Sequence, residues 1–170
     1  MTAKFHLAQL NVATILAPLD DERMRGFVEA LDHVNAIADA SPGFVWRLKD
    51  DAGNATALRP FGADMIVNMS VWESADALFD YVYRSGHKAY LARRKEWFAM
   101  PAEMHLVLWW IPAGTIPTLE EAKRRLDLLR ANGPSPEAFT FKQRFPAPAA
   151  AVASPLPLAG QVAEGEARSG

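Results

Sequence analysis

The sequence predicts one α+β domain of the ferredoxin-like type, with the element order βαββαβ and an extra helix at its C-terminal end. The chain has 170 residues, 50% of them hydrophobic, and no cysteine, so one core can form without disulfides. Strand-like patterns alternate with helical apolar spacing in the ferredoxin-like order. The four strand-like segments span residues 5–12, 44–48, 65–72 and 104–111.

The first strand-like segment is followed by a loop and a helix. Asp20 or Asp21 can cap this helix, which we expect to run to about Ala40. Ser41-Pro42-Gly43 ends it, because proline cannot continue the hydrogen-bond ladder and glycine frees the backbone. Its apolar residues recur at helical spacing: Met24, Phe27, Val28, Leu31, Val34 and Ala38.

The third strand is followed by the second helical region. Ser74 caps a helix through about Arg84, and helical character resumes from His87 to Phe98. The glycine of Ser85-Gly86 weakens a helix by about 1 kcal/mol relative to alanine, so we expect a break or kink there.

The last part of the ordered chain holds a fourth strand and a C-terminal helix. The fourth strand is hydrophobic on both faces, which predicts a central position in the sheet. Thr118 opens the helix with a capping-box pattern, and the helix is expected to end near Arg130. We therefore place the ferredoxin-like domain at residues 1–145, and expect the Ala, Pro and Gly-rich residues 146–170 to be disordered.

One face of the predicted sheet is neither apolar nor fully polar. In a ferredoxin-like sheet both helices cover one face, and something else must cover the other. A mixed face of this kind fits a ligand cavity closed by a second subunit, which predicts a homodimer. Its residues are Leu7, Gln9, Asn11, Asn68, Ser70 and Trp72.

Charge and missing motifs exclude several function classes. The formal net charge is −2, so no electrostatic signature for nucleic acid or acidic membranes is present. The sequence shows no signal-peptide pattern and no apolar run of about 18 residues, so a cytoplasmic location is expected. It has no phosphate-binding glycine loop, nucleophile elbow or zinc-protease helix motif, and no metal-ligand spacing among its histidines.

Side chains that can take part in chemistry recur along the second helical region at spacings of three and four residues. On a continuous helix they would share one face and could bind a carboxylate, move a proton or ligate haem iron. The alternative is a structural stripe that performs no chemistry. The residues are Tyr83, His87, Tyr90, Arg94 and Trp97.

Polar and aromatic strand residues complete the candidate site. Asn11 and Asn68 sit between apolar neighbours, and a buried amide needs a partner, which can be a ligand, the backbone or water. Ser70 and Trp72 share their face, and Trp46 is a further aromatic candidate for ligand contact. Adjacent Trp109 and Trp110 must point to opposite faces, and core or interface roles are the main alternative for the tryptophans.

Five stretches of the chain resemble a bacterial family known as a domain of unknown function. The resemblance covers about residues 5–142, nearly all of the expected domain. The stretches are Phe5-His-Leu-Ala-Gln-Leu-Asn11, Ser41-Pro-Gly-Phe-Val-Trp-Arg47, Tyr83-Arg-Ser-Gly-His87 continuing to Arg94-Lys-Glu-Trp-Phe98, Leu108-Trp-Trp-Ile-Pro-Ala-Gly114 and Gly133-Pro-Ser-Pro-Glu-Ala-Phe139.

That family in turn resembles the dimeric α/β-barrel superfamily, which includes antibiotic-biosynthesis-type and haem-degrading monooxygenases. Val71-Trp72-Glu73-Ser74 is similar to the Trp-Glu-Ser turn of those enzymes. The haem-degrading relatives use an asparagine, a tryptophan and a helix histidine, for which Asn11, Trp72 and His87 are the nearest equivalents. The resemblance implies a dimer and either no cofactor or haem, with His87 as the only metal ligand if haem binds.

Two functions remain open from the sequence. The first is a small-molecule enzyme, monooxygenase-like, that acts on an apolar or aromatic ligand with His87, Asn11 and Asn68 as catalytic groups. Tyr83, Arg94, Trp97, Trp72, Trp46 and Ser70 would then bind the ligand. The second is a non-catalytic dimer that senses or carries a small ligand in the same pocket.

Overall fold

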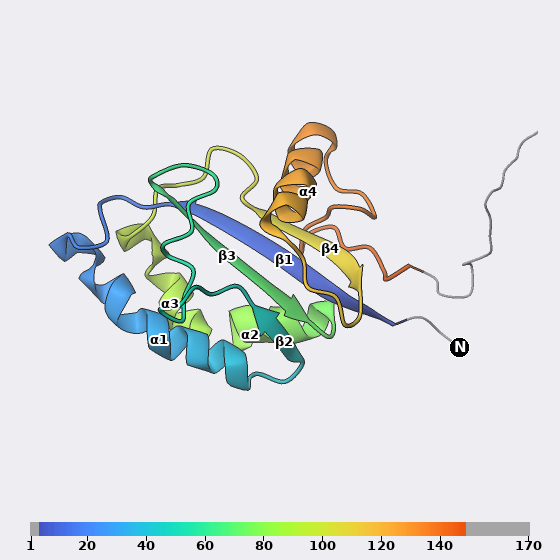
Figure 1. The fold of residues 1–170 in the computed structure, drawn as a ribbon, viewed down its shortest axis with the longest axis horizontal. Helices are drawn as coiled ribbons and strands as arrows, with labels where there is room; N and C mark the ends of the chain where they lie inside the picture. The colour runs from blue at the N-terminus through green and yellow to red at the C-terminus, as the bar shows by residue number, and fades with distance from the viewer. Residues whose placement is uncertain (1–3, 149–170) are drawn as a thin grey trace, which may run out of the picture.

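The computed structural model describes residues 4–148, which form a four-stranded antiparallel sheet with helices on both sides (Figure 1). The order across the sheet is β2-β3-β1-β4, as in a ferredoxin-like fold, so the predicted fold class is confirmed. The predicted tail lies outside the described residues, except for residues 146–148. The strands are β1 (Phe5–Thr14), β2 (Phe44–Arg47), β3 (Met65–Trp72) and β4 (Leu106–Pro112).

Helices α1, α2 and α3 lie on one side of the sheet, and α4 lies on the other (Figure 1). None of the helices within residues 4–148 is long and apolar enough to cross a membrane. The helices are α1 (Arg25–Ala40), α2 (Ala75–Arg84), α3 (His87–Ala92) and α4 (Leu119–Asn132), with short 3-10 turns η1 (Glu22–Met24) and η2 (Arg94–Glu96).

Three of the predicted helix caps are present. The side chain of Asp21 accepts a hydrogen bond from the backbone N–H of Arg23 at 2.9 Å, at the start of η1. Ser74 and Thr118 accept equivalent bonds at 3.0 and 3.1 Å at the starts of α2 and α4. Each cap satisfies a backbone donor that the first turn of a helix leaves free, which explains why the chain turns into a helix at these points.

The two faces of the sheet carry different layers. Ala8, Leu10 and Val12 of β1 belong to an apolar cluster that α4 covers, together with parts of the loop joining β2 to β3. The alternate residues of the same strand, beginning with Leu7, face α1 and α2. This alternation follows from the period of two along a strand.

The mixed polar face therefore lies on the side of α1 and α2, whereas the sequence interpretation placed it on the face without helices. The register pairs Gln9 with Ser70 and Asn11 with Asn68, so these residues form one patch on the side of α1 and α2. The sequence pattern separates the two faces of a strand, but it does not show which face the helices cover. That choice depends on the handedness of the strand–helix crossovers.

Strand β4 is an edge strand, so its predicted central position is also wrong. Trp109 faces the cluster under α4 and Trp110 faces the opposite side, as the alternation predicts. The second side is covered by the segment after α4, where Phe139 exchanges two backbone hydrogen bonds of 2.8 Å with Leu108. This segment both buries the strand and pairs part of its free edge, which accounts for an edge strand that is apolar on both faces.

Candidate functional site

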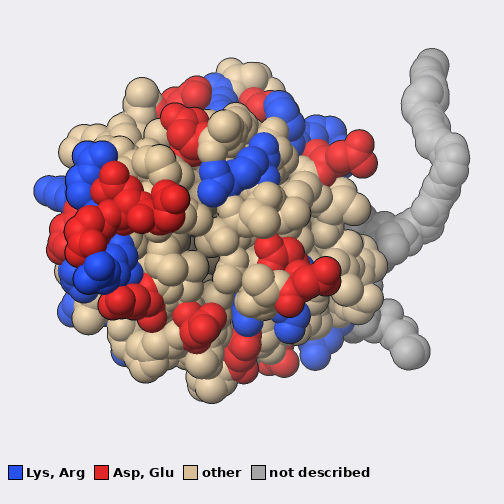
Figure 2. Space-filling model, turned by 60° about the vertical axis from the view of Figure 1, so that its left-hand side comes forward, with Lys and Arg blue, Asp and Glu red and all other residues tan. Residues whose placement is uncertain are grey.

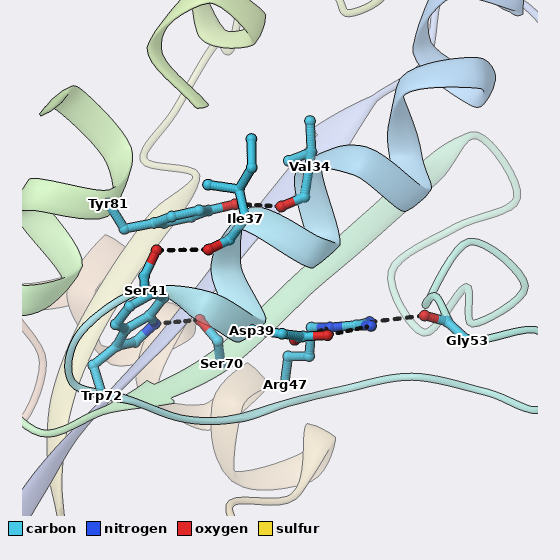
Figure 3. A network of polar contacts seen from close by, with 9 residues as sticks. All are labelled: Val34, Ile37, Asp39, Ser41, Arg47, Gly53, Ser70, Trp72 and Tyr81. Atoms are coloured by element: carbon cyan, nitrogen blue, oxygen red, sulfur yellow. Dashed lines mark hydrogen bonds and ion pairs between the residues drawn. The ribbon is translucent and has the colours of Figure 1, made fainter. Parts of the chain in front are cut away.

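Four side chains from β1 and β3 form a hydrogen-bonded group, here called the amide network. The Gln9 amide nitrogen donates to Asn68 Oδ1 at 2.6 Å and to Ser70 Oγ at 2.9 Å. The indole N–H of Trp72 donates to the same Ser70 oxygen at 2.8 Å (Figure 3). Gln9 and Ser70 are buried, so these bonds supply the partners that buried polar groups require.

The network reaches solvent at one end. Asn68 is exposed although it lies within a central strand, and its cross-strand neighbour Asn11 is half-buried. The flanking residues of β3, Val67 and Met69, are buried in the cluster on the other face. The helices on this side thus leave an opening above the pair of asparagines, and the structure brings these two predicted site residues together.

A line of aromatic side chains, here called the aromatic row, runs from β3 into α2 and α3. Trp72 stacks on Tyr81 with ring centroids 5.1 Å apart, and Tyr81 lies 4.8 Å from His87. His87 is 5.9 Å from Tyr90, and Tyr90 is 5.1 Å from Trp97. The amide network and the aromatic row meet at Trp72, so three predicted residues (Trp72, His87 and Trp97) lie in one connected layer.

The titratable groups of the aromatic row favour their uncharged forms. Burial raises the pKa of the Tyr81 and Tyr90 phenols above the usual value. Burial also lowers the pKa of His87, although the hydrogen bond to the Val82 carbonyl acts in the opposite direction. At neutral pH the row is therefore a neutral surface, with one imidazole able to accept a proton.

The conformation of His87 leaves one of its nitrogens available. Its Nδ1 lies 3.2 Å from the carbonyl oxygen of Val82, an acceptor, so this nitrogen carries the proton. Nε2 is then the acceptor. The Tyr90 hydroxyl is buried and has no hydrogen-bond partner among residues 4–148, which makes it an unsatisfied donor in the same row.

The helix break predicted at Ser85-Gly86 is present, and it separates part of the predicted row. Ser85 has an extended backbone, and its hydroxyl bonds to Tyr81 O and to the N–H of His87. A Cβ on Gly86 would lie 2.9 Å from the terminal methyl carbon of Ile37 on α1, so that side chain would have to shift for a larger residue. The helical region is therefore divided into two helices, α2 and α3, which do not share one continuous face.

Two predicted ligand-binding residues of this region lie apart from the row, Tyr83 before the break and Arg94 in η2 beyond the end of α3. Tyr83 is 40% exposed and packs on Phe79 and Phe141. Arg94 is exposed in η2, near enough to His105 to help lower the pKa of that imidazole, after burial. The prediction that both residues share one helix face with His87 is therefore wrong.

Two predicted tryptophans pack in different layers, Trp97 fully buried and Trp46 partly buried. Trp97 is 1% exposed and packs against Phe27 of α1, with ring centroids 5.8 Å apart. Trp46 packs on the opposite face of the sheet, against the cluster under α4. A ligand touching the amide network therefore does not touch Trp46 through the sheet.

Arg47 joins three elements at the edge of this layer. Its guanidinium bonds to Asp39 of α1 at 2.8 and 3.3 Å and to the backbone carbonyl of Gly53 at 2.8 Å (Figure 3). Its side chain is only 14% exposed, and it pairs in register with Ser70. Arg47 thus fastens the loop after β2 to α1, beside the amide network.

Haem does not fit the surroundings of His87. A haem ligand needs an open flat space beside its free nitrogen, whereas this ring packs between Tyr81 and Tyr90. Two open grooves beside α1 have no wall residue from the aromatic row. The same residues contain no group of three or more His, Asp or Glu side chains placed to hold a metal ion.

Sequence reasoning missed two residues of this layer. Gln9 was assigned to the mixed face but not to the site, and its inward-facing amide in an apolar strand was the available signal. Tyr81 lies in an ordinary amphipathic helix and had no such signal. Its place between Trp72 and His87 depends on how α2 packs on the sheet.

The fold is similar to that of several solved structures, among them these three. SnoaB from Streptomyces nogalater, a cofactor-independent oxygenase, is 16% identical with a TM-score of 0.41, covering 66% of this chain and 98% of its own. Rv0793 from Mycobacterium tuberculosis is 15% identical with a TM-score of 0.42, covering 66% and 99%. A proposed antibiotic biosynthesis monooxygenase from Nitrosomonas europaea is 13% identical with a TM-score of 0.41, covering 69% and 97%.

Activities do not transfer between proteins at this degree of similarity. No curated protein matches the chain. One family does match, over residues 6–154, and it is described as a domain of unknown function, DUF3291. Because the match spans most of the sequence, the chain belongs to the DUF3291 family.

Proposed function

We propose that this protein is a small-molecule enzyme, monooxygenase-like in kind, which binds a neutral apolar or aromatic ligand on the helix-facing side of its sheet. The observation that carries the proposal is the exposure of Asn68 in the middle of a central strand, on a side that helices otherwise cover. An amide there is a polar group at the end of an otherwise buried network. Such an arrangement is typical of a ligand site with a few polar groups in apolar walls.

The chemistry of the surrounding layer selects for an uncharged ligand. Tyr81 and Tyr90 are partly exposed aromatic residues of this layer, with the fully buried Trp72 behind Tyr81, and burial raises the pKa of both phenols so that they stay neutral. Arg47, the nearest cation beside Ser70, is already neutralised by Asp39. A charged ligand would lose its hydration without gaining an ion partner in this layer.

His87, Asn11 and Asn68 receive different roles in this proposal. His87 accepts a proton from the ligand at Nε2, because burial favours its neutral form and Nδ1 is held by Val82. Asn11 and Asn68 hold a hydroxyl or carbonyl oxygen of the ligand through their amide groups. Any oxygen chemistry would then start from a ligand that has lost a proton.

Binding tests the site first. The probes are 1-naphthol and 1,4-naphthoquinone, followed by tryptophan fluorescence and by the NMR shifts of β3. Asn68→Ala should weaken binding by about two- to tenfold, the value of one hydrogen bond. Asn132→Ala, an exposed asparagine at the end of α4, is the matched control and should leave binding unchanged. Equal binding by wild type and Asn68→Ala would refute the site.

Turnover distinguishes the two functions that share this pocket. The packing of His87 between Tyr81 and Tyr90 restricts access to its ring, and this favours the second function, a non-catalytic dimer that senses or carries the ligand. Oxygen uptake in the presence of 1-naphthol, lost in His87→Ala while binding persists, supports the enzyme. Binding without uptake in the wild type supports the carrier, and light scattering at micromolar concentration tests the dimer.

A further inference from the structure

An open groove lies between α1 and the loop that joins β2 to β3, away from the amide network. Its volume is about 480 Å³, within the usual range for small-ligand sites. The space-filling view of the end where α1 begins shows acidic and basic side chains around a hollowed, largely uncharged middle (Figure 2). The groove is lined by Leu19, Asp20, Val28, Leu31, Asp32, Ala52, Asn54 and Thr56.

The apolar part of the groove has a fixed base and an open edge. Leu19 and Leu31 pack partly against the cluster that holds Met24 and Phe27, so their positions are set by the core. Val28 lies three residues before Leu31 on α1, on the same face, and is 41% exposed. An apolar ligand body laid here would cover aliphatic surface that water now contacts.

The charged part of the groove consists of carboxylates only. Asp20 and Asp32 line it, and neither forms an ion pair with any residue of the described range 4–148. A second shallow groove shares Leu19, Asp20 and Val28 with it and is also lined by Arg25, which is paired with Glu22. Three arginines near the groove are each engaged by another carboxylate, in the pairs Arg23–Asp21, Arg25–Glu22 and Arg47–Asp39. A fourth, Arg59, donates to the backbone carbonyls of Thr56 and Ala63.

The loop wall is held by hydrogen bonds within the loop and to α1, and its own lining residues, Ala52, Asn54 and Thr56, are uncharged. Asn54 Oδ1 accepts from the backbone N–H of Thr56 at 3.0 Å and from its hydroxyl at 2.7 Å, which closes the loop on itself. Arg47 holds the same loop to α1 through Gly53. The groove therefore has two anchored walls, and the charged side chains that line it are the carboxylates Asp20 and Asp32.

We propose that this groove binds a small organic cation, a primary ammonium carried on an aliphatic or aromatic body. The body lies on Val28 and Leu31, and the ammonium lies between Asp20 and Asp32, the unpaired carboxylates of the wall. Opposite charge favours a cation here and disfavours an anion of the same shape. This site is independent of the amide network, since the two share no residue.

The test compares three probes of one shape: 2-phenylethylammonium, neutral 2-phenylethanol and anionic 3-phenylpropanoate. Each is titrated into the full chain at low salt and followed by the backbone amide signals of α1 and of the loop at 52–56. The ammonium should shift these signals saturably, more tightly than the alcohol, and the anion should not bind. Added salt should weaken the binding of the ammonium probe, because salt screens exposed charges.

Variants locate the charge. Asp20→Asn and Asp32→Asn should each lower the affinity for the ammonium probe by about two- to fivefold, as expected for an exposed ion pair. The affinity for the alcohol should stay unchanged in both variants. Glu120→Gln, an exposed carboxylate on α4 across the sheet, is the matched control. Equal affinity for ammonium and alcohol, shifts outside the groove, or unchanged affinity in the double variant would overturn the proposal. None of these outcomes bears on naphthol binding at Asn68.

Discussion

Removal of the Ser70 hydroxyl tests the amide network most directly. Ser70→Ala deletes the acceptor of two bonds, from the Trp72 indole at 2.8 Å and from the Gln9 amide at 2.9 Å, with almost no change in shape. Gln9 keeps its bond to Asn68 at 2.6 Å. The Trp72 indole N–H, in a fully buried side chain, loses its acceptor.

The expected cost follows from that one unsatisfied donor. A buried donor without a partner costs about 1–3 kcal/mol, so the free energy of unfolding of Ser70→Ala should fall by that amount. Urea unfolding followed by far-UV circular dichroism measures it, because the signal does not depend on Trp72.

A double-mutant cycle separates this cause from a general loss of packing. In a Trp72→Phe background the donor is absent, so Ser70→Ala should cost clearly less than in the wild type. A loss below about 0.5 kcal/mol in the wild-type background, or an equal loss in both backgrounds, would show that the hydroxyl does not support Trp72.

Three further predictions concern the backbone, the loop and pH. Gly43→Ala should lower the free energy of unfolding more than Gly53→Ala in thermal unfolding; both have positive φ, 82° and 89°, but only the first would place its Cβ 2.6 Å from Ala77 Cβ. Equal losses would contradict this contact. Arg47→Met should speed amide hydrogen exchange in the loop holding Gly53 by about fivefold, because the guanidinium no longer ties that loop to α1; unchanged exchange would mean that the loop holds itself. Burial lowers the pKa of His87, so the unfolded chain binds its proton more readily, and the stabilisation present above pH about 6.5 should be lost as pH falls through the lowered pKa. Unfolding at pH 5 and pH 8 measures this difference, which should shrink in His87→Phe.

Local sequence signals were sufficient where an element's start or end depends on its own residues. Ser74 and Thr118 cap the helices they were expected to cap, and Asp21 caps the 3-10 turn η1 that leads into α1, because a capping side chain bonds to a backbone N–H only two or three residues away. The break before His87 was foreseen for a similarly local reason, a glycine inside a helical pattern.

The candidate site was predictable only in part. Asn68, Ser70 and Trp72 alternate along one strand, so their common face follows from the period of two. Gln9 lies beside Ser70 because of the register between β1 and β3, and Tyr81 lies on Trp72 because of how α2 packs on the sheet. Neither contact can be predicted from the spacing of residues along the chain. Tyr83 left the expected row because the break at Ser85 and Gly86 changes the direction of the chain.

By itself, the sequence determined the order of the elements, their caps and the division of each strand into two faces, because these depend on neighbours within a few residues. Only the tertiary structure decided that the mixed face lies under α1 and α2, that β4 is an edge covered by the segment at Phe139, and that a groove opens beside Asp20 and Asp32. These features depend on contacts between segments far apart in the chain. Such contacts are set by how whole elements pack, which no local pattern contains.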